Sequence, residues 1–229
     1  MLTMPKLNIK GVIVSNDEKW IYDWYEVEAI CPKDVQDVID SANGEKIETE
    51  INSPGGDIFA GADIYSALML YKGEVEHVIT SLAGSAASEV AMSGKCYMMP
   101  SALLMVHNVA VYGASGDYHE MDKMSEMLKK ANQSIANTYM VKSGMSAEET
   151  LEMMDKTTWM TAQEAKDKGL IDGILFIEDG KNLSFTNGLD GMLSKAQIEH
   201  AKNERKKQQI EAQKQEILKN ELLEDLDFI

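Results

Sequence analysis

The feature that most limits how this chain can fold is an alternation of short apolar segments with segments that favour helices. Glycine and other small residues separate several of these segments, as in the runs at residues 53–56 and 84–88. Strands that alternate with helices at these lengths are typical of βαβ units, in which crossover helices connect parallel strands. The sequence therefore predicts an α/β fold.

The period of the apolar residues indicates where the strands and helices lie. We expect strands over residues 6–14, 46–51, 75–81, 96–99 and 103–106. We expect helices over residues 32–41, 58–69, 118–141 and 147–154, and a turn that opens into a further helix over residues 82–94. Residues 20–31 have no clear period, which indicates mixed strand and loop.

The predicted organisation is one domain followed by a separate helical segment. The α/β pattern ends near residue 177, so residues 1–177 form the expected domain. Residues 178–193 are expected to be a linker, because Gly, Asn and Asp are frequent there. Residues 194–229 are rich in Lys, Gln and Glu and favour a helix, but their apolar stripe is too irregular for a coiled coil.

The charge balance limits the possible partners. With 38 acidic and 22 basic residues the net charge is −16, which disfavours binding to nucleic acid or anionic lipid. No apolar run could span a membrane, and the N-terminal residues lack the features of a secretory signal. We therefore expect a cytoplasmic protein.

Neither cysteine spacing nor any nucleotide motif predicts a bound metal or cofactor. Cys31 and Cys96 lie far apart and are interpreted as buried small apolar residues in a reducing compartment. A loop of the form GxxxxGKS or GxxxxGKT does not occur, so any dependence on ATP would come from a partner.

Three segments could supply the parts of a nucleophilic site, which needs an activated hydroxyl, a base and oxyanion donors. Ser85 lies among small residues at a predicted strand-to-helix junction. His107 follows an apolar strand, at the end where ligands gather in open α/β folds. The glycine pair in residues 53–56 could direct backbone N–H groups into a site. Taken singly, each has a structural alternative: a helix N-cap, a structural histidine and an ordinary turn.

Four motifs in order resemble the proteolytic subunit of the Clp protease, and in particular its phage-encoded relatives that act in head (prohead) maturation. They are residues 51–56 with the helix that follows, the serine run at 84–88, residues 100–107, and residues 161–172. The resemblance covers residues 6–177. It implies a ClpP/crotonase-like spiral of βαβ units with a handle helix at residues 118–141, and assembly as a homo-oligomeric ring.

The resemblance also implies the site residues of a serine endopeptidase that cleaves protein substrates. An ungapped match places the nucleophile at Ser85, whereas Ser88 would require an insertion. His107 is then the general base, and the oxyanion donors are the backbone N–H groups of Gly56 and Ala86.

The third member of the triad departs from the family pattern. Thr157 occupies the position of the family aspartate. Asp155 lies two residues earlier, and in an extended segment the two side chains would share a face, so we favour Asp155. Asp172, another acid, or a triad without a carboxylate are the alternatives.

Two other functions compete with the peptidase. A crotonase-type acyl-CoA enzyme shares the spiral fold, but it would not explain Ser85 and His107 together. A non-catalytic scaffold or assembly protein would explain Thr157 and the charged segment after residue 193. That segment is interpreted either as a contact to capsid or scaffold proteins or as a solvated helix.

Overall fold

We describe the fold from a computed structural model, in which residues 5–177 and the helical residues 204, 205 and 207 are described. The chain divides into two units, at residues 1–179 and 180–229, and the first unit carries the fold. The predicted linker and almost all of the predicted helical segment at 194–229 lie outside the described residues, so these remain predictions.

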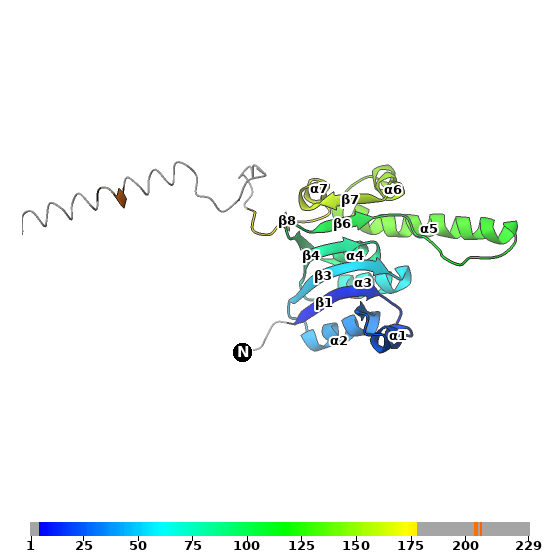
Figure 1. Ribbon diagram of the computed structural model, residues 1–229, viewed down its shortest axis with the longest axis horizontal. Coiled ribbons are helices and arrows are strands. Elements are labelled where there is room, and N and C mark those ends of the chain that lie inside the picture. The colour runs from blue at the N-terminus through cyan, green and yellow to red at the C-terminus, as the bar shows by residue number, and fades with distance from the viewer. Residues whose placement is uncertain (1–4, 178–203, 206, 208–229) are drawn as a thin grey trace, which may run out of the picture. The chain divides into compact units, whose positions relative to one another are not determined.

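The first unit alternates strands with helices, as Figure 1 shows. The strands are β1 (Lys6–Ile13), β2 (Ala29–Ile30), β3 (Ile47–Gly56), β4 (Val75–Gly84), β5 (Lys95–Met98), β6 (Leu103–Val106), β7 (Thr158–Thr161) and β8 (Gly173–Ile174). The helices are α1 (Lys19–Trp24), α2 (Pro32–Ala42), α3 (Ile58–Leu70), α4 (Ala86–Val90), the 3-10 turn η1 (Ala91–Ser93), α5 (Tyr118–Ser143), α6 (Ala147–Asp155) and α7 (Ala162–Asp167).

The sheet is parallel except at one pair of strands. Its order is β2-β1-β3-β4-β5-β8, and β6 adds to β4 beyond the part of β4 that pairs with β5. Of the described strands, only β7 runs antiparallel, against β6. The predicted α/β fold with parallel strands is therefore confirmed.

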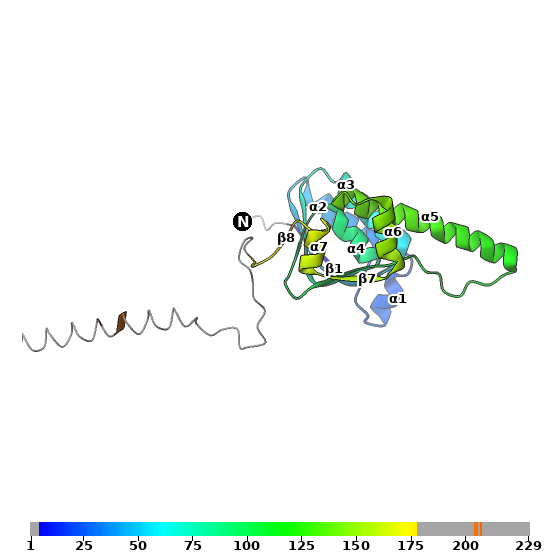
Figure 2. The ribbon, with the colours of Figure 1, turned by 90° about the horizontal axis from the view of Figure 1, so that it is seen from above.

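The helices lie on both sides of this sheet. Figure 2 shows α2, α3 and α4 on one side of the strands and α1 on the other. Helix α5 extends away from the sheet in both views, and only Ala136, Thr138 and Tyr139 of this helix are buried. This long helix lies where the handle helix was predicted.

Most predicted elements occur with ends shifted by one or two residues, but a helix at residues 19–24 was missed and two strands are longer than expected. Residues 20–31 contain the expected strand as β2, but they also contain most of helix α1. The aromatic residues of α1 show no helical period because none of them is buried. Strand β3 continues through the expected turn at 53–56, and β4 continues three residues beyond Ser81 to Gly84. The helix expected within 82–94 occurs as α4 followed by η1.

The core lies between the sheet and the helices on its covered face, where apolar side chains from β1, β3, β4 and α3 pack together. Both cysteines are buried and free, as the sequence predicted. His77 is also fully buried, and its ring nitrogens form hydrogen bonds with the hydroxyls of Thr49 and Ser93. Burial lowers the pKa of His77 to about 3, so this histidine is a neutral part of the core.

Candidate active site

The site forms where three parallel strands end side by side. In the register of the sheet, Ser53 of β3 pairs with Ala83 of β4, and Gly84 of β4 pairs with Met105 of β6. Residues that follow these pairs therefore leave the sheet at the same edge, where parallel α/β folds place their ligands. This register brings the glycine pair, Ser85 and His107 together.

Ser85 has a backbone conformation that aims its side chain away from the helix it precedes. It lies between β4 and α4 with φ 52° and ψ −127°, which is rare for a residue with a side chain. Its N–H donates to the carbonyl of Met105 at 2.9 Å, which ties it to β6. Although Ser85 is at the N-cap position, its hydroxyl does not cap the helix, so the purely structural interpretation fails.

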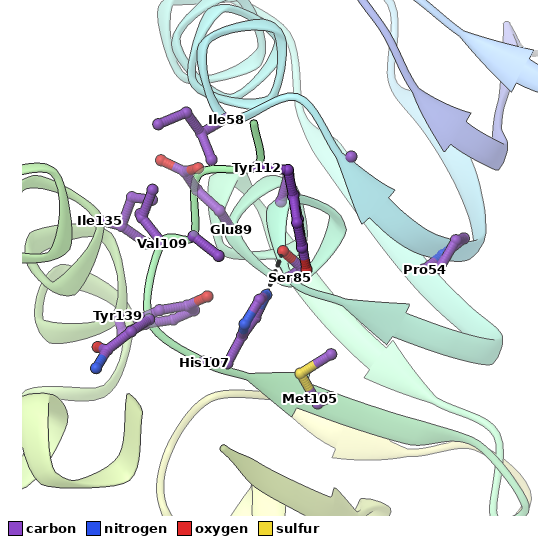
Figure 3. A pocket seen from close by; sticks show the side chains of 14 residues that line it. Pro54, Ile58, Ser85, Glu89, Met105, His107, Val109, Tyr112, Ile135 and Tyr139 are labelled. Atoms are coloured by element: carbon purple, nitrogen blue, oxygen red, sulfur yellow. Dashed lines mark hydrogen bonds between the residues drawn. The ribbon is translucent and has the colours of Figure 1, made fainter. Parts of the chain in front are cut away.

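The Ser85 hydroxyl instead meets His107. The Oγ atom lies 2.8 Å from Nε2 of the imidazole, a distance that allows direct proton transfer (Figure 3). His107 is the first residue after β6, as predicted. The pair can therefore act as nucleophile and general base.

A cavity of about 320 Å³ opens beside this pair. It is lined by Gly56 and Ala86, and on its apolar side by Ile58, Val109 and Ile135. Ala86 is the first residue of α4, and the first N–H groups of a helix have no partner within that helix. The cavity wall thus contains the Ser85 hydroxyl, the His107 imidazole and the first residue of α4.

Comparisons with known proteins agree with this geometry. Residues 37–178 match the family model described as Clp protease. The ATP-dependent Clp protease proteolytic subunit 1 of Chlamydia abortus is 36% identical over 137 residues, which cover 58% of this chain and 71% of the relative. This chain belongs to the Clp protease family. It is accordingly a serine protease, a hydrolase, and the crotonase alternative is excluded.

Two further relatives agree with this assignment. The ATP-dependent Clp protease proteolytic subunit of Bacteroides fragilis is 32% identical over 135 residues, which cover 58% of this chain and 65% of that protein. The solved structure of a ClpP1 mutant from Listeria monocytogenes aligns with a TM-score of 0.62 at 22% identity and covers 77% of this chain and 94% of that one. The structural match supports the predicted Clp fold.

The hydroxyl of Ser88, the alternative nucleophile, forms hydrogen bonds away from His107 in this Clp-family site. It is fully buried, its hydroxyl donates to the Ser85 carbonyl at 2.6 Å, and it shares a hydrogen bond with the Tyr139 hydroxyl at 2.8 Å. The first contact lies within the N-terminal turn of α4, and the second joins α4 to α5. Ser88 is therefore a structural residue behind the cavity.

Asp155 lies close to the site but does not contact His107. Its Oδ1 accepts a hydrogen bond of 2.6 Å from the side-chain amide of Asn108, and no hydrogen bond joins it to the imidazole. The expected extended segment is wrong, because Asp155 is the last residue of α6 and Thr157 (φ 49°) turns the chain into β7. Residues 155 and 157 therefore do not share a strand face, and Thr157 is exposed.

The other acid considered, Asp172, is engaged away from the serine. It accepts hydrogen bonds from the Cys96 N–H and from the Lys142 ammonium group. His119 lies in the first turn of α5 and stacks on Tyr118. Neither residue forms an interaction with the Ser85 and His107 pair.

Glu89 is a residue of the cavity that the sequence analysis missed. It lies one helical turn after Ser85, is 3% exposed, and lines the same cavity. A charged residue within the small-residue run at 84–94 was the available signal.

Among the described residues no helix is long and apolar enough to cross a membrane.

Proposed function

We propose that this protein is an endopeptidase in which Ser85 is the nucleophile and His107 the general base. The observation that carries this proposal is the 2.8 Å contact between Ser85 Oγ and His107 Nε2 in the wall of a cavity. The positive φ of Ser85 supports it, because strained conformations are retained where function requires an exposed side chain.

The reaction proceeds in two steps, acylation of Ser85 and hydrolysis of the acyl-enzyme. His107 Nε2 takes the proton of Ser85 as the hydroxyl oxygen attacks the peptide carbonyl. The imidazolium then gives this proton to the departing amine, the C–N bond breaks, and an ester to Ser85 remains. Water loses a proton to His107 while it attacks this ester, and Ser85 regains the proton when the acid product leaves.

The negative charge of each tetrahedral intermediate needs donors that are already in place. We assign this role to the backbone N–H groups of Gly56 and Ala86. Both residues line the cavity beside Ser85, and the position of Ala86 at the start of α4 leaves its N–H free of helical bonds.

We assign Asp155 the third position of the triad as a positioning residue that acts through Asn108. Its support is the Asn108 to Asp155 hydrogen bond, which fixes the residue directly after His107. A second bond, from the Val109 N–H to the Asn132 side chain, anchors the same turn to α5. These two contacts would keep the imidazole oriented toward Ser85.

At the level of biology, we propose a cytoplasmic, homo-oligomeric ring that processes capsid or scaffold proteins during phage head maturation. The ring and the maturation role rest on the sequence resemblance. The protease activity that the maturation role requires is supported by membership of the Clp family. A catalytically weak scaffold protein is the alternative, and the Ser85 and His107 contact argues against it.

Labelling by a fluorophosphonate probe tests the chemistry, because the probe reacts only with an activated serine. Wild-type protein should label and cleave unfolded protein substrates, and Ser85→Ala and His107→Ala should lose at least about a thousandfold in rate. Ser88→Ala is the matched control and should label. Labelling that survives in Ser85→Ala would contradict the assignment.

The maturation role has its own test. Co-expression with capsid and scaffold proteins, followed by mass spectrometry of the assembled particle, should yield product termini that are absent with Ser85→Ala. If particles made with wild type and with Ser85→Ala have identical termini, the maturation role is wrong, and the peptidase assignment is unaffected.

A further inference from the structure

The cavity beside Ser85 holds a carboxylate that has no partner. Glu89 is the fourth residue of α4, and its N–H bonds back to the Ser85 carbonyl at 3.3 Å. The side chain is buried, and its Oε2 atom accepts no hydrogen bond. Among the described residues nothing forms a side-chain hydrogen bond or ion pair with Glu89.

The surroundings of this carboxylate are apolar. In Figure 3 it points toward the side chains of Ile58 and Ile135, and both residues line the cavity. An ionised carboxylate in such a place is costly unless a positive charge accompanies it. Burial accordingly raises the pKa of Glu89 to about 7.

The chemistry of the reaction supplies the missing charge. The Glu89 N–H hydrogen-bonds to the Ser85 carbonyl, and both residues line the same cavity, so Glu89 lies about one helical turn from Ser85. A peptide whose carbonyl is attacked by Ser85 carries a side chain on the adjacent carbon, and a long side chain reaches one turn into the cavity. The apolar walls at Ile58 and Ile135 suit a methylene stem.

We propose that Glu89 makes this protease select Lys or Arg at the residue on the acyl side of the cleaved bond. The stem of that side chain packs against the apolar wall, and its cationic head pairs with the Glu89 carboxylate. The inference rests on the proposed function, since it takes Ser85 as the attacking group. Glu89 is then a specificity residue that contacts substrate.

The experiment compares two fluorogenic peptide amides on the full-length protein. They are identical except that one has lysine before the scissile bond and the other norleucine, which has the lysine carbons without the ammonium group. Wild-type protein should cleave the lysine peptide with the higher kcat/KM. Glu89→Gln, which keeps the shape and removes the charge, should lower the lysine-to-norleucine ratio by about thirtyfold or more.

Two further variants make the result specific. Glu89→Leu should favour norleucine outright, because it completes the apolar wall. Glu152→Gln removes a carboxylate of α6 from an exposed ion pair with Lys156 and should leave the ratio unchanged.

Labelling with the fluorophosphonate probe separates the two proposals. If wild type labels but cleaves norleucine at least as well as lysine, the inference is overturned and the peptidase assignment stands. An unchanged ratio in a Glu89→Gln protein that labels normally also overturns it. If Glu89→Gln fails to label, the inference is tested instead by two results: the lysine-to-norleucine ratio of wild type, and whether Glu89→Leu prefers norleucine. An absence of lysine preference in wild type, or of norleucine preference in Glu89→Leu, overturns the inference. Wild-type protein that neither labels nor cleaves overturns the proposed function itself.

Discussion

The side-chain amide of Asn108 donates a hydrogen bond of 2.6 Å to Asp155, and this bond takes the place of the expected contact between Asp155 and His107. The acid therefore orients the residue next to the base. The Oδ1 atom of Asn108 is buried and has no hydrogen-bond partner among the described residues. The Asn108 side chain is therefore anchored by the Asp155 bond, while the backbone of the same turn is held by the bond from the Val109 N–H to the Asn132 side chain.

A double-mutant cycle tests this indirect role. Asp155→Ala and Asn108→Ala should each lower the rate of fluorophosphonate labelling about tenfold, the size expected for one hydrogen bond to a charged group. The double variant should be no slower than either single variant, because both remove one bond. kcat should fall with KM nearly unchanged in protein that circular dichroism shows to be folded, because an unfolded fraction would also lower the apparent kcat without changing KM.

Glu152→Ala serves as the control for this cycle, since it removes an exposed partner of Lys156 on the same helix. It should label at the wild-type rate. If Asp155→Ala alone were as slow as His107→Ala, the carboxylate would contact the imidazole directly in the working enzyme, and the indirect role would be wrong.

Gly55 should be as necessary for the site as Ser85. Its φ is +97°, and an added Cβ would lie 2.7 Å from Ser85 Cβ and 2.8 Å from the Ala86 nitrogen. Gly55→Ala should therefore displace Ser85, abolish labelling and cost about 1–3 kcal/mol in the free energy of unfolding. Gly44→Ala is the matched control: φ is +87° there, and nothing lies within 4 Å of the added Cβ. It should lose stability but keep full labelling, and equal labelling of both variants would contradict the prediction.

Ser88 should matter for stability and not for chemistry. Ser88→Ala leaves the buried Tyr139 hydroxyl without its partner and should cost about 1–3 kcal/mol, measured by denaturant unfolding at fixed protein concentration. Tyr139→Phe in addition should recover part of this loss, because no polar group then remains unpaired. A loss of labelling in a folded Ser88→Ala protein would contradict the structural role of Ser88 and make it a candidate nucleophile.

The sequence predicted the parts of the site that depend on strand order. Ser85 and His107 each follow an apolar strand, and parallel strands place their ends at one edge, so their meeting was predictable. The contact of Asp155 was not, because it depends on where α6 ends and on the left-handed turn at Thr157. A threonine in that conformation has no sequence signal.

Glu89 shows a second limit of sequence reasoning. A glutamate on a short helix is usually solvated, and its burial follows from how α3 and α5 close over α4. The helix α1 was missed for the opposite reason: its aromatic residues, Trp20 and Trp24 among them, are exposed, so no buried face imposes a helical period.

The raised pKa of Glu89 predicts how stability should vary with pH. The folded state keeps a proton on Glu89 up to about pH 7, whereas the unfolded chain releases it near the ordinary value of 4.5. Between these values the folded state binds more protons, so the free energy of unfolding falls as pH rises. The Glu89 contribution is fully present below pH 4.5 and is lost above about pH 7.

Glu89→Gln isolates this contribution, because all other carboxylates titrate alike in both proteins. The free energy of unfolding of wild type minus that of the variant should be about 3 kcal/mol larger at pH 4.5 than at pH 8. The titratable groups facing Glu89 are Tyr65 and Tyr139, whose pKa values are raised by burial, and His107 across the cavity. Neither tyrosine ionises in this range, and His107→Ala in both backgrounds controls for the imidazole. A difference that does not vary with pH would mean that Glu89 is ionised and solvated in the folded protein, and the cavity would then lack the buried charge on which lysine selection depends.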